Sequence, residues 1–594
     1  MYGDWGTSKA YVIGLAFAVG GYASFPLIAA MCVLTALVGI NYMIICRLYP
    51  DGGGVYASVR HRSEVISIVG AFLLIADYLV TAAISALSAF QYLGVPHPEK
   101  FAAAAILIIG LLNLLGPKHT GGLAFLISVP TAIVVVVLGL FCLPHMGEAI
   151  GHLQPLHGGF WQNWGGFVGI VLALSGVEAI ANATGVMKLD PGSDEAHPSV
   201  RQTSTPAILW VMIEVCVFTA LLGLAMHALG GLQAVNGDVN APGAPGVRDY
   251  LLRYMGEVFV GGALGPAIGH TFGIVVSIVF GLLLLSAVNT AIVDLITIQF
   301  LMARDREMPP IFQRLNKWGV PSAGMLLATV VPMLLVILVK DMAGLADLYA
   351  VGVVGAIATN LGATATDRKL TIKTWERTLM FVTFLVMAAI EMSLLIDKPN
   401  ARYFAVTILA AGLILRGLVQ ERRMKKEAIA LPALVPEKLP VSGATPEPAS
   451  AIPPAPVLGA ESILCAVRGT GRTLDFALRE AHETGRRLYL LFVREQQFMT
   501  EQDVKRKWQE DPEASSIFAE AKEKTGADHP PPLFCYAVSP SAAETIVDVA
   551  ATLGASRLIL GAPQRNALLN LLRGNVIREV SNSLPEEIDL LVYA

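Results

Sequence analysis

Charged residues are scarce in this chain: Asp, Glu, Lys and Arg together account for 15% of its 594 residues. Soluble domains usually carry about a quarter charged residues, so the composition excludes an ordinary soluble protein. Hydrophobic residues make up 54% of the chain, and the mean hydropathy is +0.61. The net charge of −4 adds little, because acidic and basic residues are segregated along the chain. No nucleic acid is expected as a partner.

Cysteine is also rare, and the six that are present show neither a CxxC pair nor a spacing typical of metal ligands. This pattern argues against a zinc site and against a disulfide framework, so the cysteines are interpreted as apolar filling. The N-terminus lacks the basic region that precedes the apolar run of a cleavable signal peptide. We expect no metal site, no cofactor and no enzymatic activity.

Long apolar runs dominate the chain up to about residue 420. About 20 such residues suffice to cross a bilayer as a helix, which predicts a polytopic α-helical protein embedded in lipid. The first of the expected spanning segments is short and counts as the remainder of a helix. The twelve segments are 8–19, 24–46, 63–91, 101–116, 121–143, 165–186, 205–230, 266–302, 321–340, 344–364, 378–395 and 401–419.

Lysine and arginine are unevenly distributed between the loops, which sets the expected orientation. If the first segment runs outward, the inner loops collect most of these residues, whereas the loop 145–164 contains none. The basic run Arg422, Arg423, Lys425 and Lys426 then falls inside. We therefore expect a multi-pass protein of the cell membrane whose C-terminal part is cytoplasmic.

The composition changes abruptly after the last apolar segment. Residues 1–420 are expected to form the membrane domain, and the Pro- and Ala-rich stretch 421–459 reads as a cytoplasmic linker. From residue 460 to residue 594, short apolar runs alternate with amphipathic stretches. That alternation is typical of a small α/β domain with a doubly wound parallel sheet.

Three polar residues follow one another at helical spacing in the third segment. Asp77, Thr81 and Ser85 are four residues apart, so they share one stripe of the helix. A carboxylate and two hydroxyls suit a hard monovalent cation or a substrate ammonium group. The alternative is that the hydroxyls bond their own i−4 carbonyls, with Asp77 near the inner water interface.

Two further clusters interrupt apolar segments with polar residues. In the sixth segment, Glu178 lies beside Gly176 and Ser175, which is the pattern of a discontinuous helix whose freed carbonyls can coordinate a cation. Glu178 could alternatively hydrogen-bond a neighbouring helix. The opening stretch also breaks an apolar segment, and segments one and six stand five apart, as two repeats of five would require. An exposed N-terminus would explain its polarity equally well. It contains Gly3, Asp4, Gly6, Thr7, Ser8 and Tyr11.

The opening residues YGDWGTSKAY (2–11) resemble the YGDIGTSPLY hallmark of Kup-type potassium uptake permeases, within the amino acid–polyamine–organocation superfamily. The rest of the membrane part is more similar to the KimA-type branch of that family. The matching stretches are YPDGGGVY (49–56), DYLVT (77–81), GVEAI (176–180), ARD (303–305) and LYAVG (348–352). Several of these patterns are superfamily-wide, whereas the opening one is specific and points to potassium.

The resemblance implies a LeuT-like fold of two inverted repeats of five helices, plus two further helices. It also implies a secondary active transporter that imports potassium by proton symport, with Glu178 or Asp4 carrying the proton. A cytosolic regulatory domain and a homodimer are further expectations. The residues implied to bind the substrate or ion are Asp4, Thr7, Tyr11, Asp77, Thr81, Ser85, Ser175, Glu178 and Tyr349.

The chain departs from the family pattern at three places: its start, Lys9 and Ser175. It begins at the helix break, so the inner half of the first helix is expected to be missing, and a start codon placed too far downstream is the simplest explanation. Lys9 stands where the hallmark has proline. Its ammonium would lie near the cation path or snorkel toward the outer face. Ser175 stands where KimA-type proteins tend to have threonine, which preserves the hydroxyl.

The C-terminal residues GAPQ (561–564) and Gly574-Asn575 resemble the phosphate loop of universal stress proteins. The resemblance implies a nucleotide-binding site at Gly561, Gly574 and Asn575. Gln564 replaces the second glycine of the loop, so the backbone cradle for a phosphate is partly lost. A regulatory dimerisation domain, or a sensor for a different nucleotide, is at least as consistent with these residues.

The main rival interpretation is an amino acid or polyamine permease of the same superfamily. Such a protein would bind an α-carboxylate at a glycine-rich break in the first helix. Here the break carries Asp4, a carboxylate that repels an α-carboxylate and attracts a cation. A membrane-tethered stress sensor that transports nothing is disfavoured, because a mere anchor has no need of buried Thr81, Ser85 and Glu178.

Overall fold

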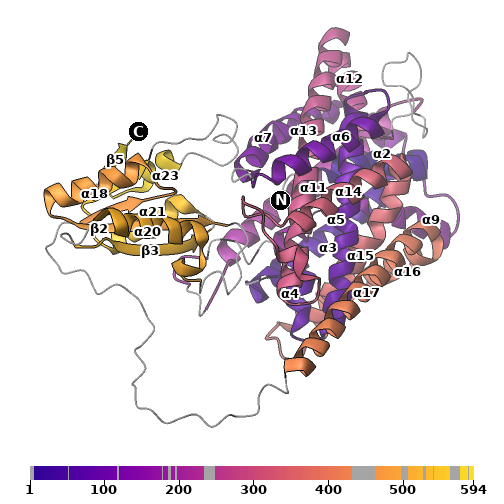
Figure 1. Cartoon of the computed structure of the whole chain (residues 1–594). Helices are drawn as coiled ribbons and strands as arrows, with labels where there is room; N and C mark the ends of the chain where they lie inside the picture. Colours follow the sequence, from indigo (N-terminus) through magenta and orange to yellow (C-terminus); the bar gives the residue numbers. More distant parts are fainter. Residues whose placement is uncertain are drawn as a thin grey trace. The chain divides into compact units, whose positions relative to one another are not determined.

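A computed structural model provides the structure of the chain. The residues that it describes are 6–50, 52–116, 120–174, 176, 178–182, 184, 187, 189–193, 197–232, 248–430, 462–496, 506–525, 530–539, 541–561, 576–585 and 587–593. They form two compact units, a helical one within residues 1–112, 120–313 and 323–420 and a sheet-containing one within residues 113–119, 314–322 and 421–594. Each unit is described by itself (Figure 1).

The helical unit consists almost entirely of α-helices and short 3-10 turns. Its longer helices are α2 (Ser8–Gly20), α3 (Phe25–Leu48), α5 (Glu64–Tyr92), α6 (Pro98–Asn113), α7 (Thr120–Cys142), α11 (Arg201–Ala225), α12 (Leu251–Leu264), α13 (Pro266–Arg304), α14 (Ser322–Val339), α15 (Met342–Thr366), α16 (Thr374–Asp397) and α17 (Pro399–Ala430). Shorter elements between them are η1 (Gly21–Ala23), α4 (Val55–Arg60), η2 (Leu143–His145), α8 (Met146–Gly151), α9 (Phe160–Val168), η3 (Val171–Leu174), α10 (Ala179–Asn182), η5 (Met226–Ala228) and η6 (Pro310–Gln313).

Nine helices among the described residues are long and apolar enough to cross a membrane, which confirms a polytopic helical protein. The expected segments 8–19 and 101–116 correspond to α2 and α6, which have 13 and 16 residues and fall short of that length. The expected segment 165–186 is divided between α9, η3 and α10. A total of twelve spans therefore stays a prediction. The short helix α12 lies where no segment was expected, and Gly265, with φ +100°, turns the chain from it into α13.

The centre of the helical unit is built around α5, which packs against both α13 and α15. Most of α5 is buried within the protein. A second group forms where α3 packs against α11, and α2 contacts both of these helices. The segment η3 reaches α2, α3 and α15. Three helices, α2, α3 and α15, thus meet at the broken segment that follows α9.

The sheet unit has five parallel strands in the order β3-β2-β1-β4-β5, which confirms the predicted doubly wound sheet. Helices α18 and α20 pack with one apolar core of the sheet, and α21 and α23 pack with the other. The strands are β1 (Ser462–Ala466), β2 (Arg487–Glu495), β3 (Leu533–Ser539), β4 (Arg557–Gly561) and β5 (Asp589–Tyr593). The helical elements are α18 (Arg472–Thr484), η8 (Trp508–Glu510), α20 (Pro512–Thr525), α21 (Ala542–Thr552) and α23 (Val576–Ser583).

Candidate functional site

The polar stripe of α5 is buried along its whole length. Asp77, Thr81 and Ser85 are 1%, 2% and 0% exposed. The Thr81 hydroxyl lies 2.9 Å from the backbone carbonyl oxygen of Asp77 and 3.2 Å from its Oδ1. The alternative interpretation, a bond to the i−4 carbonyl, therefore holds for Thr81, although the same hydroxyl also contacts the carboxylate. For Ser85, no described group lies within hydrogen-bond distance of Oγ.

The helix α15 approaches this stripe more closely than a larger residue would permit. A Cβ atom added to Gly352 would lie 2.7 Å from the backbone nitrogen of Asp77. Tyr349, one turn earlier on α15, is 1% exposed. Since side chains three residues apart share a face of a helix, Tyr349 belongs to the face of α15 that packs against α5.

The sixth apolar segment is discontinuous, as its glycine and buried acid predict. The turn η3 ends at Leu174, and Gly176 has φ +79°. Glycine reaches this left-handed backbone without the strain of a Cβ atom. Glu178 follows in the turn before α10 and is 3% exposed. The break therefore places a buried carboxyl group where the backbone is not helical.

A glycine loop ahead of α4 holds the second half of this broken segment. The Gly53 amide donates to the carbonyl of Ala181 at 3.0 Å and to the hydroxyl of Thr184 at 2.8 Å. The Gly53 carbonyl in turn accepts from the Asn360 side chain of α15 at 3.0 Å. Asn360 also accepts a hydrogen bond from Ser58 of α4 at 2.9 Å. We call this set of contacts the Gly53 clamp.

The start of α2 brings two more expected residues into the protein interior. The hydroxyl groups of Thr7 and Tyr11 lie 2.6 Å apart, and both side chains are buried. Tyr92, at the end of α5, donates to the carbonyl of Ala10 at 2.5 Å. This bond ties α2 to the helix that carries the polar stripe.

The candidate residues thus lie on α2, α5, α15 and the broken segment, and every described one is at most 3% exposed. These described side chains are therefore buried in the interior of the helical unit. Within α5, the Thr81 hydroxyl contacts the Asp77 carboxylate. Across the helix interface, Gly352 of α15, one turn after Tyr349, lies against the backbone of Asp77. Thr7 and Tyr11 are joined to this group through the packing of α2 against η3. Asp4 and Ser175 lie outside the described residues.

Buried polar residues that sequence patterns had not singled out complete the surroundings. Tyr42 of α3 is 1% exposed and lies within electrostatic reach of both Glu178 and Asp77. It therefore joins the α5 stripe to the broken segment. Tyrosine and asparagine in apolar segments give a weak signal, because neither carries a charge at neutral pH. Glu214 of α11 gives a stronger signal, since it is an acidic residue within segment 205–230.

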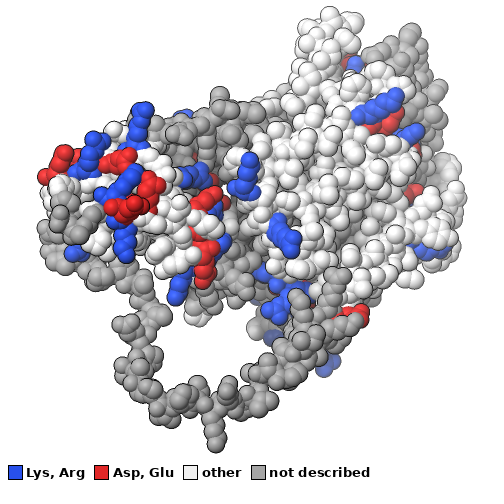
Figure 2. Space-filling view, in the orientation of Figure 1, with Lys and Arg blue, Asp and Glu red and all other residues white. Residues whose placement is uncertain are grey.

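Ion pairs gather away from this interior. In Figure 2, most of the visible surface of the helical unit carries neither acidic nor basic side chains, whereas the sheet unit is covered with both. The pairs at helix ends include Arg47 with Glu376, where two bonds of 3.0 and 2.8 Å form a bidentate contact. Arg60 likewise pairs with Asp305, in the ARD stretch of the sequence. These pairs tie helix ends to one another, and Glu376, which is 2% exposed, is a buried carboxylate that is used in this way.

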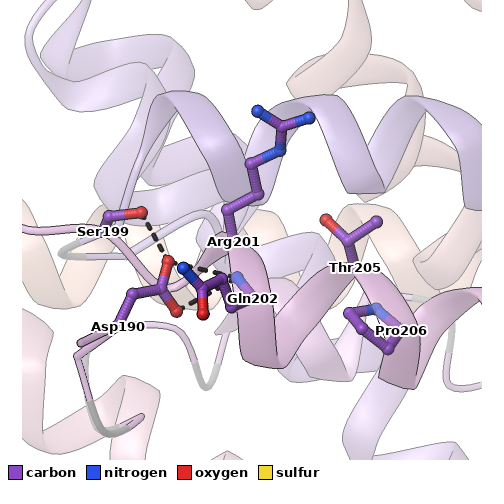
Figure 3. A pocket seen from close by; sticks show the side chains of 6 residues that line it. All are labelled: Asp190, Ser199, Arg201, Gln202, Thr205 and Pro206. Atoms are coloured by element: carbon purple, nitrogen blue, oxygen red, sulfur yellow. Dashed lines mark hydrogen bonds between the residues drawn. The ribbon is translucent and has the colours of Figure 1, made fainter.

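A polar pocket at the start of α11 is distinct from this site. Asp190 accepts from the hydroxyl of Ser199 at 2.6 Å and from the Gln202 amide at 3.0 Å (Figure 3). Burial opposes ionisation of Asp190, yet these hydrogen bonds hold its pKa below the usual range. The guanidinium of Arg201 extends away from the carboxylate (Figure 3). Asp190 thus satisfies the first amide groups of a helix, which is a structural role.

In the sheet unit, Gly561 lies at the end of β4, and a Cβ atom there would meet the Thr473 hydroxyl at 2.8 Å. Arg468, which follows β1, pairs with Glu495 at the end of β2 at 3.2 Å. Gly574 and Asn575 lie outside the described residues. Carboxyl ends of parallel strands are where such sheets bind ligands. At the carboxyl end of β1, Arg468 is therefore a basic group that is already paired.

Comparison with known proteins assigns both parts of the chain. Residues 3–419 match the family model described as amino acid permease, and residues 460–588 match that of the universal stress protein family. A probable potassium transport system protein Kup 1 from Bradyrhizobium is 30% identical over 220 residues, which cover 33% of this chain and 36% of that protein. The potassium transporter KimA of Bacillus subtilis is 26% identical over 351 residues, 56% of this chain and 53% of that protein.

The chain thus spans between about a third and a half of the length of these curated relatives. A universal stress protein from Archaeoglobus fulgidus has a solved structure that is 21% identical to this chain. The match covers 22% of this chain and 97% of that structure, with a TM-score of 0.18. The C-terminal part is a universal stress protein domain by its family match.

Proposed function

Because the chain belongs to the amino acid permease family, we propose that it is a secondary active transporter that imports potassium by proton symport. The observation that carries the proposal is the buried set of oxygen donors on α5 and the broken segment. Asp77, Thr81, Ser85 and Glu178 are all at most 3% exposed. A weakly hydrated cation can exchange its water shell for such oxygens. The curated relatives named above are potassium transporters, which supports the same substrate.

The proposed mechanism assigns separate tasks to the two acids. Asp77 and the hydroxyls of Thr81 and Ser85 bind the cation together with Thr7, Tyr11 and Tyr349 near the start of α2 and on α15. Glu178, placed after the Gly176 turn, carries the proton. Protonation of a buried carboxylate removes one negative charge from the site. Protonated Glu178 and the bound cation cross together, as symport requires, and both are released on the inner side. Asp4 and Ser175 are proposed to complete the ion path.

The architecture is proposed to follow the same relatives. Twelve spans would form two inverted repeats of five helices plus two further helices. The protein would lie in the plasma membrane, with the linker 421–459 and the domain 460–594 in the cytoplasm. This domain would regulate transport as part of a homodimer, with Gly561, Gly574 and Asn575 near a regulatory nucleotide.

The second candidate is an amino acid or polyamine permease, which the description of the matching family favours. Two acids in the interior would disfavour an α-carboxylate, because like charges repel strongly in a desolvated site. A polyamine is compatible with acidic groups, so a direct competition experiment must separate it from potassium.

The test uses the purified chain in liposomes with an inward proton gradient. We expect uptake of labelled rubidium, a potassium substitute, that is competed by potassium and abolished by a protonophore. Glu178→Gln should lose this uptake and remain folded, whereas Glu148→Gln, a change at an exposed acid, should keep it. Uptake of labelled amino acid or putrescine, without rubidium uptake, would replace the proposal with the second candidate.

A further inference from the structure

Lys9 is a cation held entirely within the helical unit. Its side chain has no exposed surface, and it lies in the first turn of α2. The Nζ atom is 3.0 Å from the carbonyl oxygen of Gly6 and 3.0 Å from each carboxylate oxygen of Glu214 on α11. The expectation that Lys9 snorkels toward the outer face is therefore wrong. Among the described ion pairs, no other lysine or arginine is so completely buried.

The three oxygens around Nζ match the donors of an ammonium group. A lysine ammonium has three N–H groups and no acceptor, and three oxygens lie at hydrogen-bond distance. Backbone carbonyl and carboxylate oxygens are also the ligands that hard cations take in proteins. An ammonium ion and a potassium ion make contacts of similar length with oxygen. The same cage would therefore accept a free monovalent cation if the lysine were absent.

The charge balance explains why this cage is never left empty in the wild-type chain. An ionised group within a spanning segment is costly unless it is paired, and removing one partner of a buried pair leaves an uncompensated charge. Glu214 is 19% exposed in its side chain, so water or an ion has a route to it. Lys9 is covalently attached, so the positive charge cannot dissociate during a transport cycle.

We propose that the Gly6 carbonyl and the Glu214 carboxylate form a second monovalent-cation site, which the Lys9 ammonium occupies permanently. This site shares no residue with the proposed potassium site, because Glu214 belongs to α11 and Asp77 to α5. The tethered ammonium takes the place of a co-transported ion. Binding at this position is therefore independent of external sodium. Glu214 is neutralised by it and does not carry the transported proton.

The experiment is a chemical rescue of Lys9→Ala, followed by the melting temperature of the detergent-solubilised full chain. In choline chloride, the variant should melt below the wild type. Sodium chloride should raise its melting temperature saturably, by about 2 °C or more. The wild type should show no such difference between choline and sodium; potassium is omitted, because its binding at the proposed transport site would stabilise every variant. Lys398→Ala is the matched control, because Lys398 pairs with Asp347 at 2.8 Å but is 36% exposed, and it should also respond equally to both salts.

The same measurement can overturn the proposal. A Lys9→Ala protein that responds identically to choline and to sodium has no cation site at this position, and Lys9 is then a packing residue. If Lys9→Ala gives no folded protein, the double variant Lys9→Ala with Glu214→Gln should restore a monodisperse peak on size exclusion, without salt selectivity. A double variant as poorly folded as the single one would also reject the proposal. Neither readout depends on which substrate is transported.

Discussion

Two aspartates with the same burial have opposite surroundings in the two units of this protein. Asp77 in the helical unit is 1% exposed and Asp511 in the sheet unit is 0% exposed. Asp77 is accompanied by the Thr81 hydroxyl, the Gly352 backbone and the nearby phenol of Tyr42. The Thr81 hydroxyl and the Tyr42 phenol supply neutral oxygen atoms. Burial alone therefore does not identify a functional acid, whereas the chemical nature of its neighbours does.

Asp511 shows what a structural acid requires. Arg494 contacts both of its carboxylate oxygens, and the Tyr536 hydroxyl donates at 2.9 Å. The backbone amide groups of Glu513 and Ala514 complete an N-terminal cap for α20. Burial by itself would raise the pKa of Asp511, but the hydrogen bond from Arg494 and the other donors bring it below the usual value of 3.8. The charge of Asp511 is thus fully used in holding the fold.

The largest expected effect is on transport and comes from Asp77→Asn. If the carboxylate binds the cation, its removal should lower rubidium uptake by about 10- to 100-fold, which corresponds to the loss of a charged contact. The melting temperature should change little, because asparagine keeps the shape of the side chain. Asp397→Asn, at the exposed end of α16, is the control. Uptake that is the same in both variants would contradict the role of Asp77.

The close approach of α15 to Asp77 can be disturbed without changing any charge. Gly352→Ala places a Cβ atom 2.7 Å from the Asp77 nitrogen, which overpacks the interface between α5 and α15. We expect destabilisation of about 1–3 kcal/mol, measured as a lower melting temperature in detergent. Gly417→Ala on α17 is the matched control, because no atom lies within 4 Å of the added Cβ. Alanine favours a helix more than glycine does, so a loss of the same size in both variants would contradict the role of the contact.

In the sheet unit, Asp511→Asn should lower stability while leaving the transport site intact. Loss of a charged hydrogen-bond acceptor costs about 1.5–3 kcal/mol, and faster hydrogen exchange of β2 and β3 would report it. Rubidium uptake at neutral pH should remain within about twofold of the wild type, a change equal to less than 1 kcal/mol. If uptake instead falls as far as in Asp77→Asn, the distinction between the two acids fails.

The pH dependence of the sheet unit follows from the same residue. The folded-state pKa of Asp511 lies below its usual value of 3.8, so its ionised form contributes stability at every pH above that value. This contribution is lost as the pH falls through the lower, folded-state pKa. Hydrogen exchange of β2 and β3 should therefore accelerate in acid more for the wild type than for Asp511→Asn. Equal acceleration would assign the acid sensitivity to other groups.

The smallest expected effect is that of Ser85→Ala. A neutral hydroxyl contributes about 0.5–1.5 kcal/mol to an interaction, so the apparent potassium affinity should fall by about two- to tenfold. Since no described group bonds the Ser85 Oγ atom, folding should be unaffected. Ser88→Ala, three residues after Ser85 and hydrogen-bonded to the sulfur of Met342, should leave the affinity unchanged. Affinity lost equally in both would place the effect in the packing of α5.

Local sequence patterns carried much of the fold and part of the candidate site. Alternating apolar runs predicted the parallel sheet, and the spacing of Asp77, Thr81 and Ser85 predicted a stripe that proves to be buried. Gly176, two residues before Glu178, predicted the break. Glycine adopts a positive φ without strain, and an acidic residue within an apolar segment is costly unless it has polar partners. The rule that flagged Glu178 applies equally to Glu214, so this residue was within reach of the sequence.

Contacts between distant residues were not accessible in this way. Gly53 and Asn360 are separated by more than 300 residues, yet the Asn360 side chain donates to the Gly53 carbonyl at 3.0 Å, and no periodicity relates them. The pair of Lys9 with Glu214 likewise depends on how α2 packs against α11. Even Thr81 satisfied both interpretations at once, since one hydroxyl contacts the carbonyl and the carboxylate of Asp77. The sequence predicts helices better than it predicts partners.

The Gly53 clamp has a mechanical consequence. The Gly53 amide donates to the Ala181 carbonyl of α10, and the Gly53 carbonyl accepts from the Asn360 side chain of α15. One residue therefore links the two helices. Any motion that separates α10 from α15 must first break the hydrogen bonds of the Gly53 amide or carbonyl, which are short-ranged and are lost over a small displacement. The link between the two helices is therefore either intact or broken. The end of the protein that contains it is therefore expected to switch between two positions without intermediate openings.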